Sequence, residues 1–384
     1  MQGAWWVGPD ELNEEQRNVL SLPLDDDFLI KGPPGSGKTN LLLLRGNYLY
    51  RAGQQNIAIL VFTRTLRNFI ASGADQYAFP NDLVQTSRKW AQTLLFEYGY
   101  RPEFPEKFDE QRAYVIDCLN QLMREQNVEC VYDAILLDEA QDYLPEEIAI
   151  FRRLARRVFA VADSRQKIYE GHDGLSELEK QVECFRLHYH YRNGLKICRF
   201  ADGLARDVAD YEPLEATCNY DETARPSSVD HVECKDLQEQ STRIIDSLGV
   251  QLKAYPGEMI GVVSPRKSEV EILWEQIYAA GFGDISVLQL GGEHADFRDD
   301  TRICVATCHA VKGLEFRALH FAGCEYLKKF RHQRRLAYMA ATRAKTSLSI
   351  YYSGRLPGYF QGAIAQMNPA TQLPDLSDIF GGAQ

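Results

Sequence analysis

The chain has 384 residues, with 43 basic and 54 acidic side chains and a formal net charge of −11. Hydrophobic residues make up 45% and charged residues 25%, which is a globular composition that excludes a disordered chain or a coiled coil. This length predicts two domains. The acidic total argues against indiscriminate nucleic-acid binding, although it leaves room for a local basic groove.

No apolar run approaches the roughly 20 residues of a membrane span, and the N-terminus lacks the features of a signal peptide. We therefore expect a cytoplasmic protein without a membrane partner. Of nine scattered cysteines, only Cys304 and Cys308 lie close together, with His309 after them. Because two more ligands at fitting spacing are not evident, we expect reduced, mostly buried thiols rather than a metal site.

The first half of the chain alternates strand-like and helix-like segments. A short apolar run ends at Ile30 in a Gly-rich turn, and a helical pattern follows it. Further buried-strand patterns occupy 57–62, 134–137 and 158–161. Such alternation is typical of an α/β fold whose parallel sheet is covered on both faces.

The second half repeats this pattern after a boundary near 185–190. Strand candidates occupy 259–263, 285–288, 303–306, 319–322 and 348–352, and helical stretches fall near 266–281 and 333–344. The stretch 207–257 is polar and irregular, and we interpret it as an insert. The chain from 367 to 384 is predicted to be a loose tail.

The segment after the first strand fits the P-loop pattern G-x-x-x-x-G-K-[ST]. Its residues are Gly32, Pro33, Pro34, Gly35, Ser36, Gly37, Lys38 and Thr39. Backbone N–H groups in such a loop converge on phosphate oxygens, and the following helix adds its positive dipole. Lys38 is expected to reach the β- and γ-phosphates of ATP, and Thr39 to hold Mg²⁺.

A pair of acids ends another buried strand, at Asp138 and Glu139. Asp138 is predicted to complete the Mg²⁺ shell, and Glu139 to polarise the attacking water. A carboxylate that only stabilises a helix N-terminus is the alternative. These residues together predict a P-loop NTPase, and many functions share that fold.

Seven motifs in one order resemble the UvrD/Rep-type superfamily 1A DNA helicase family. They are 12–17 (LNEEQR), 61–64 (VFTR), 138–142 (DEAQD), 163–169 (DSRQKIY), 190–192 (HYR), 307–316 (TCHAVKGLEF) and 334–344 (RRLAYMAATRA). The resemblance implies two RecA-like domains, 1–187 and 188–366, with ATP in the cleft between them. It implies movement along single-stranded DNA driven by closure of that cleft.

The resemblance also assigns roles to residues in these motifs. It places Gln16 and Tyr191 near the base, Gly313 and Glu315 beside the nucleotide, and Gln166 as a sensor of the γ-phosphate. Asn40 stands at the position near the base where relatives usually carry an arginine, which makes selectivity for the base of ATP less secure. Arg192 and Arg343 would stabilise the transition state from the second domain, an effect worth about 10³–10⁵ in rate. Candidate strand contacts are Phe62, Thr63, Arg64, Trp90, Tyr169, Thr307 and His309. For Trp90, a core position is an equal alternative.

The chain departs from the family in two intervals where full-length relatives carry large insertion subdomains. Only a small helical insert near 71–131 and the polar insert at 207–257 remain. A translocase, or a helicase completed by a partner, is therefore the expected function. An ATP-driven switch that regulates a partner such as a nuclease is the alternative, and a P-loop kinase or GTPase fits the motifs poorly. RNA remains open as a substrate.

Overall fold

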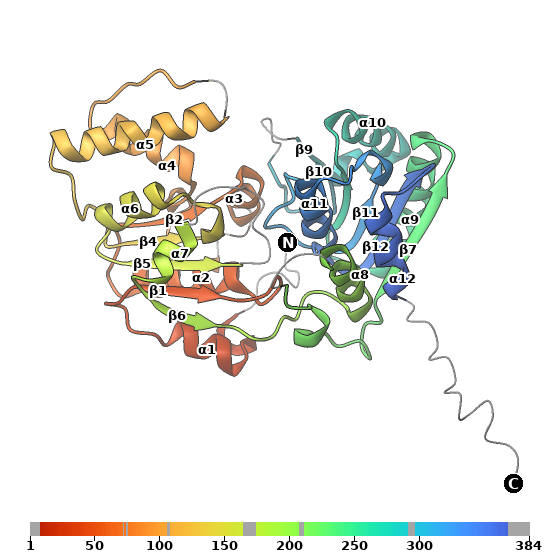
Figure 1. Ribbon diagram of the computed structural model, residues 1–384, viewed down its shortest axis with the longest axis horizontal. Helices are drawn as coiled ribbons and strands as arrows, with labels where there is room; N and C mark the ends of the chain where they lie inside the picture. The colour runs from red at the N-terminus through yellow and green to blue at the C-terminus, as the bar shows by residue number, and fades with distance from the viewer. Residues whose placement is uncertain are drawn as a thin grey trace, which may run out of the picture.

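The computed structural model describes residues 8–71, 73, 76–105, 108–163, 174–206, 211–290 and 296–367. Two lobes lie side by side, and each is built on one parallel sheet (Figure 1). The first sheet has the strand order β3-β2-β4-β5-β1-β6, and the second has the order β7-β12-β11-β8-β10-β9. These two sheets confirm the predicted α/β architecture.

The first lobe contains strands from Phe28 to Arg186. Its strands are β1 (Phe28–Lys31), β2 (Ile57–Val61), β3 (Val84–Thr86), β4 (Ala134–Leu137), β5 (Val158–Ala162) and β6 (Glu183–Arg186). Its helices are α1 (Glu14–Leu20), α2 (Lys38–Arg51), α3 (Arg64–Ala71), α4 (Ser87–Glu97), α5 (Phe108–Glu125), α6 (Pro145–Leu154) and α7 (Gly174–Glu179).

Alternating strand residues of this sheet feed two separate cores, as side chains of a strand point to opposite faces. Ile59 and Leu136 pack on one face with α1, α2 and α3. Leu60 and Leu137 pack on the other face with α4, α5, α6 and α7. Strands β2, β4 and β5 are buried along their whole length and apolar, which is why the sequence pattern revealed them. Strands β3 and β6 are short and partly exposed, and the sequence pattern did not reveal them.

The second lobe contains strands from Ser228 to Ser353. Its strands are β7 (Ser228–Cys234), β8 (Ile260–Ser264), β9 (Ser286–Gln289), β10 (Ile303–Thr307), β11 (Phe316–Phe321) and β12 (Ala344–Ser353). Its helices are α8 (Leu195–Ala205), α9 (Leu237–Ala254), α10 (Lys267–Ile277), α11 (Arg331–Ala341) and α12 (Gly358–Met367). Of the predicted tail, Met367 ends α12, and 368–384 lie outside the described residues.

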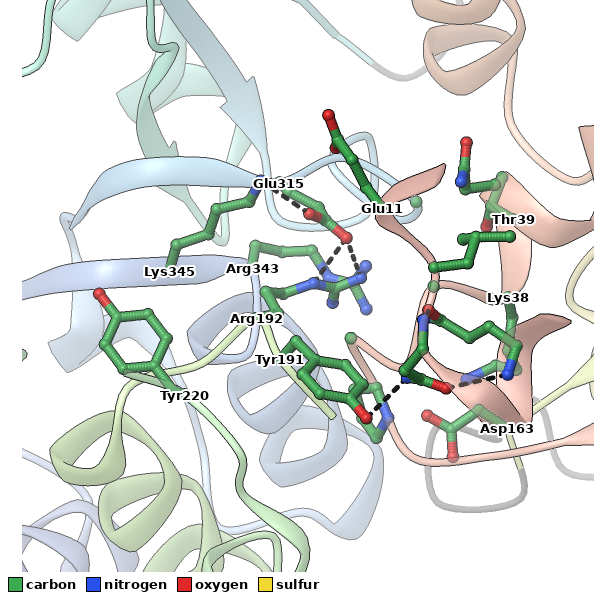
Figure 2. A pocket seen from close by; sticks show the side chains of 18 of the residues that line it. Glu11, Lys38, Thr39, Asp163, Tyr191, Arg192, Tyr220, Glu315, Arg343 and Lys345 are labelled. Atoms are coloured by element: carbon green, nitrogen blue, oxygen red, sulfur yellow. Dashed lines mark hydrogen bonds and ion pairs between the residues drawn. The ribbon is translucent and has the colours of Figure 1, made fainter. Parts of the chain in front are cut away.

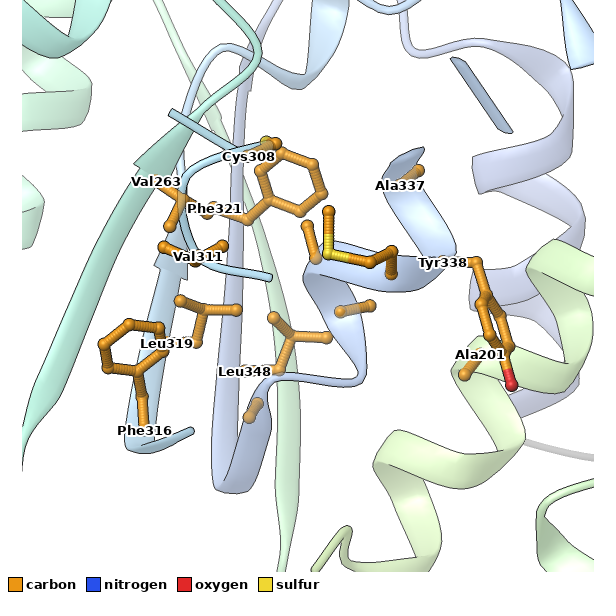
Figure 3. Close-up of a cluster of buried hydrophobic side chains, with 14 of the residues drawn as sticks. Ala201, Val263, Cys308, Val311, Phe316, Leu319, Phe321, Ala337, Tyr338 and Leu348 are labelled. Atoms are coloured by element: carbon orange, nitrogen blue, oxygen red, sulfur yellow. The ribbon is translucent and has the colours of Figure 1, made fainter. Parts of the chain in front are cut away.

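The larger core of this lobe lies between its sheet and α8, α11 and α12. Figure 3 shows Leu319, Phe321 and Leu348 of the sheet turned toward Ala337 on α11, with Tyr338 reaching Ala201 on α8. The opposite face of the sheet packs against α9 and α10. The strands that end near the cleft are thus held rigidly from both sides.

Two stretches differ from the sequence interpretation. The prediction of an irregular polar insert at 207–257 is wrong for its second part. Residues 228–254 contain the edge strand β7 and the long helix α9. Most of β7 is only partly buried, and α9 buries four side chains, so neither segment carries a strong apolar pattern. The segment 71–131 contains α4 and α5, but also the short strand β3, which pairs with β2.

Candidate functional site

The P-loop joins β1 to α2 at the carboxyl end of the first sheet. Gly35 and Gly37 have φ values of +80° and +84°, which residues with a side chain rarely adopt. Lys38 Nζ lies 2.8 Å from the carbonyl oxygens of both Gly32 and Pro33 and donates to them. Burial lowers the pKa of Lys38, against the opposing effect of the nearby carboxylates. The loop therefore has the shape and the cation that phosphate binding requires.

The predicted magnesium ligands come together beside this loop. Thr39 Oγ1 lies 3.3 and 3.2 Å from the two carboxylate oxygens of Asp138. Burial and the neighbouring charge of Glu139 raise the pKa of Asp138 to about 7. A hydroxyl and a carboxylate from two elements form a pair of hard oxygen donors that suits Mg²⁺.

Glu139 has a left-handed backbone conformation, with a φ of +51°. Burial opposes its ionisation, but the charges of Lys312, Arg343 and Lys38 outweigh burial and lower its pKa. Gln141 donates a hydrogen bond to Glu139 and accepts one of 2.9 Å from the backbone N–H of Asp163. The carboxylate is thereby oriented and kept charged, as a base that polarises water must be.

The second lobe contributes cations and a carboxylate to the same space. Glu315 accepts a hydrogen bond of 2.6 Å from Arg192 Nε and lies 3.1 Å from Lys345 Nζ. Burial acts against the charge on Glu315, but these two cations lower its pKa to about 2. Arg343 is 2% exposed and donates to the carbonyl oxygen of Met339. Burial lowers the pKa of Arg343 to about 10, so it stays charged at neutral pH.

Two of the predicted base-binding residues, Gln16 and Tyr191, lie near the start of α1. Gln16 Nε2 donates to the carbonyl oxygen of Ser36 at 3.0 Å, and Gln16 and Asn13 form a reciprocal capping box. The Tyr191 hydroxyl accepts a hydrogen bond of 2.7 Å from Asn13, and its backbone N–H donates to Gly35. Hydrogen bonds therefore connect the P-loop, the start of α1 and the segment 187–194, which links the two lobes.

These groups surround a cavity of about 610 Å³ between the lobes. Figure 2 shows Lys38, Thr39 and Asp163 facing it from the first lobe, opposite Arg192, Glu315 and Arg343. The predicted residues that line it are Gln16, Pro34, Gly35, Gly37, Lys38, Thr39, Asn40, Asp138, Glu139, Tyr191, Arg192, Gly313, Glu315 and Arg343. Gly32, Pro33 and Ser36 form the loop but are not among its lining residues, and Gln166 lies outside the described residues.

Several lining residues carried no predicted role, among them Asp163, Arg317 and Lys345. Asp163 stands in a matched motif, which was a usable signal. Lys345 directly follows the last motif, so proximity alone could have suggested it. Arg317 bonds to Glu258 and Thr346, and no pattern in the sequence joins these positions.

Lys312 is a functional candidate that the sequence interpretation passed over. It comes from the second lobe, is 2% exposed, and forms an ion pair with Asp142 of the first lobe. Its Nζ also lies 3.7 Å from a Glu139 oxygen and 5.1 Å from the centre of the Phe62 ring. Its backbone oxygen accepts a hydrogen bond from Thr63 Oγ1 at 3.2 Å. Lys312 stands in a matched motif, but its partners are distant in sequence.

A second cavity of about 400 Å³ contains most of the predicted strand contacts. Phe62, Thr63, Arg64, Trp90 and His309 all line it, together with Arg88. Burial and the neighbouring charge of Arg64 lower the pKa of Arg88, so two cations lie close together at this cavity.

Trp90 is more deeply buried than its position at this cavity suggests. It is 2% exposed and packs against Tyr132 and Phe151, so it is mainly a core residue. Thr307 is not among the lining residues, and its hydroxyl accepts a hydrogen bond from the backbone of Ala310. Tyr169 lies outside the described residues.

One family model matches the chain, that of the UvrD-like helicase C-terminal domain, over residues 302–351. This match confirms the predicted family resemblance, UvrD-like helicases, for this part of the second lobe. No curated protein matches the chain significantly in sequence. Among the described residues, no helix combines the length and the apolar character that crossing a membrane requires.

Three solved structures give a coarser likeness. The C-terminal domain of a possible DNA helicase from Lactobacillus plantarum WCFS1 is 20% identical, covering 47% of this chain and 95% of that one, with a TM-score of 0.33. The PRRSV helicase is 15% identical over 88% of this chain and 54% of that one, with a TM-score of 0.39. An arterivirus nonstructural protein 10 helicase is 15% identical over 88% of this chain and 61% of that one, with a TM-score of 0.36. The chain thus spans little more than half the length of these viral proteins.

Proposed function

Starting from a second lobe of the UvrD-like helicase type, we propose that the protein is an ATP-driven motor that moves along single-stranded DNA. The observation that carries this proposal is the composition of the first cavity. Lys38 and Glu139 of one lobe face Arg192 and Arg343 of the other across one space. Phosphoryl transfer needs this set of groups, namely a phosphate cradle, a base and additional cations for the transition state.

The first lobe would bind and activate the reactants. The P-loop backbone and Lys38 would hold the phosphates, and Thr39 and Asp138 would hold Mg²⁺, which neutralises developing charge when it is bound. Glu139 is ionised and close to this position, so it would accept a proton from the attacking water. Its hydrogen bond from Gln141 fixes the direction in which the carboxylate points.

The second lobe would make hydrolysis depend on closure of the cleft. Arg343 is buried and Arg192 is ion-paired, so neither side chain is free to swing far from the cavity. Their approach to the phosphates therefore depends on how the lobes sit relative to one another. A small displacement of one lobe would withdraw two positive charges from the transition state and slow the reaction.

The second cavity is where we place the nucleic-acid strand. It combines aromatic and apolar walls with Arg64 and Arg88, the chemistry expected of a groove that tracks a backbone without reading bases. Both lobes line it, since His309 comes from the second lobe and Phe62 from the first. Movement of the lobes would therefore change this cavity and the ATP cavity together.

Steady-state ATP hydrolysis with and without single-stranded DNA tests the proposal. We expect strong stimulation by the strand in the wild type and loss of turnover in Glu139→Gln. Competition with single-stranded RNA of the same length identifies the preferred polymer. Hydrolysis that is indifferent to both polymers would contradict the motor and favour a switch that acts on a protein partner such as a nuclease.

Strand separation needs its own assay because the family resemblance implies large insertion subdomains in two intervals of full-length relatives. In the described residues of these intervals the helices and strands are α4, α5 and β3 between 76 and 131, and β7 and α9 between 211 and 257, apart from short 3-10 turns. We propose that duplex unwinding depends on a partner. A tailed duplex that remains intact while the motor hydrolyses ATP would agree with this view. Efficient unwinding by the purified chain alone would contradict it.

A further inference from the structure

Three side chains of types that commonly bind metals lie close together beside helix α8 of the second lobe. His190, Cys198 and Cys218 each offer one ligand atom, and these atoms all lie within 4.8 Å of one another. His190 and Cys198 are fully buried, while Cys218 is partly buried. None of the three lines either cavity described above. The cluster therefore has no part in the proposed ATP or strand sites.

The polar atoms of the cluster converge on a common centre. His190 Nε2 lies 3.8 Å from Cys198 Sγ and 2.9 Å from the carbonyl oxygen of Leu214. Both sulfur atoms lie 3.4 Å from a single acceptor, the carbonyl oxygen of Asn193. The two thiols and the imidazole are thus directed toward one small volume.

The backbone holds these side chains in place independently of any bond between them. The His190 N–H donates to the carbonyl oxygen of Thr217 at 3.0 Å, and the Asn219 N–H donates to that of His190 at 2.9 Å. Cys218 therefore stands opposite His190 in an isolated parallel bridge. Cys198 is fixed separately on α8, whose apolar side packs in the main core. Three separate segments of the fold thus bring the possible ligands together.

We propose that His190, Cys198 and Cys218 bind a Zn²⁺ ion. Zinc accepts imidazole nitrogen at about 2.0 Å and thiolate sulfur at about 2.3 Å in tetrahedral geometry, which separates ligand atoms by roughly 3.5–3.8 Å. The observed nitrogen–sulfur separation of 3.8 Å fits this requirement. The largest separation allowed by the cluster, 4.8 Å, needs a contraction of about 1 Å.

Zinc is favoured over magnesium and calcium by the type of ligand. Thiolate and imidazole donors suit zinc, whereas magnesium and calcium prefer oxygen. On binding, each thiol forms a sulfur–zinc bond and releases one proton to solvent, while His190 binds as the neutral imidazole. Two protons leave and no electron is transferred. The fourth position would be filled by the Leu214 carbonyl oxygen or by water on the partly exposed side of Cys218.

A metal ion bound here would restrain the segment 187–194 between the lobes, which carries two residues of the proposed ATP site. Tyr191 and Arg192 directly follow His190 and line the first cavity. A zinc ion would tie the start of this segment to α8 and to the turn at Cys218. The ion would be structural, and its presence does not depend on the proposed motor activity.

Metal analysis of the full-length protein tests the proposal directly. The protein is purified in reducing buffer without chelator, and zinc is measured by elemental analysis. We expect about one zinc per chain. After zinc removal, cobalt should give the intense thiolate-to-metal absorption that a bound cysteine pair produces.

Cysteine variants assign the ligands. Cys218→Ser alters the least buried ligand and should weaken zinc binding more than about 100-fold, beyond the loss typical of outer-shell partners. Cys184→Ser is the matched control, because Cys184 is exposed and outside the cluster, and it should retain full zinc. Circular dichroism verifies that both variants are folded.

Several results would overturn the proposal. They are folded wild-type protein that takes up neither zinc nor cobalt, a Cys218→Ser variant with undiminished zinc, and a Cys198–Cys218 disulfide that persists in the reducing buffer. Should Cys218→Ser fail to fold, the cobalt spectrum and zinc content of the wild type decide the question.

Discussion

The two cavities between the lobes differ in the chemistry of their walls. The first has a volume of about 610 Å³ and is lined by carboxylates facing lysines and arginines. The second has a volume of about 400 Å³ and is lined largely by aromatic and aliphatic side chains with a few cations. The first is suited to a reaction in which charge develops, and the second to holding a polymer by its shape and backbone charge.

Lys312 joins these two regions. Its ammonium group contacts Asp142 and lies near Glu139, while Phe62, against which it packs, lines the second cavity. A strand that displaced Phe62 or Thr63 would therefore disturb the cation that helps to keep Glu139 ionised. In the proposed motor, this contact would be the route by which strand binding alters hydrolysis.

Among the variants considered, Arg343→Ala should have the largest effect on ATP turnover. This effect should be confined to the first cavity. Arg343→Ala is expected to lower the turnover of ATP by about 10³–10⁵, the range for a transition-state arginine, while ATP binding changes little. Fluorescent-nucleotide binding and single-turnover hydrolysis measure the two quantities. Equal losses in binding and turnover, or a large drop in thermal stability, would assign Arg343 a structural role instead.

Removing Lys312 should affect both cavities. Lys312→Met leaves the buried Asp142 carboxylate without its ion pair, and such a loss costs about 3–5 kcal/mol of unfolding free energy. The double variant Lys312→Met with Asp142→Leu should recover much of this stability, because no uncompensated charge remains at that position. Urea unfolding of the three proteins gives the comparison, and an equally unstable double variant would contradict the buried-pair account.

The same lysine should shift the pH dependence of hydrolysis. The positive charge of Lys312 helps to lower the pKa of Glu139, and the carboxylate must be ionised to act as a base. Without Lys312 this pKa rises, so the acidic limb of the rate profile should move to higher pH. A profile of Lys312→Met that coincides with that of the wild type would show that the lysine does not influence Glu139.

The ion pairs of Glu315 should contribute stability with a defined pH dependence. Its pKa falls from 4.5 to about 2 on folding, which corresponds to roughly 3 kcal/mol. Because the folded pKa is the lower one, this contribution is full well above pH 4.5 and is lost as the pH falls toward 2. Denaturation of wild type and Glu315→Gln at several pH values should show a stability gap that narrows with acidification. A gap independent of pH would count against this explanation.

The smallest expected effect concerns the second cavity. Arg64→Ala should weaken strand binding modestly and reduce by about one the slope of log affinity against log salt, because one phosphate contact is lost. Arg156→Ala serves as the control, because Arg156 is exposed and is not among the residues that line the cavity. An unchanged salt slope in Arg64→Ala would remove Arg64 from the strand path.

The sequence predicted the first cavity better than the second. The P-loop and the Asp138–Glu139 pair follow apolar strands that are easy to recognise, and parallel strands bring their carboxyl ends to one edge. Edge strand β7 and helix α9 were missed because much of their surface is exposed. The partners of Lys312 and the cluster of His190, Cys198 and Cys218 depend on contacts across the fold, which residue spacing does not encode.

The most direct test of the account is strand-stimulated ATP hydrolysis measured in parallel for the wild type, Glu139→Gln and Lys312→Met. We expect strong stimulation of the wild type by single-stranded DNA, no turnover in Glu139→Gln, and residual hydrolysis in folded Lys312→Met that the strand no longer stimulates. Hydrolysis by the wild type at one rate with and without the strand, or full stimulation of Lys312→Met, would contradict the proposed link between the two cavities.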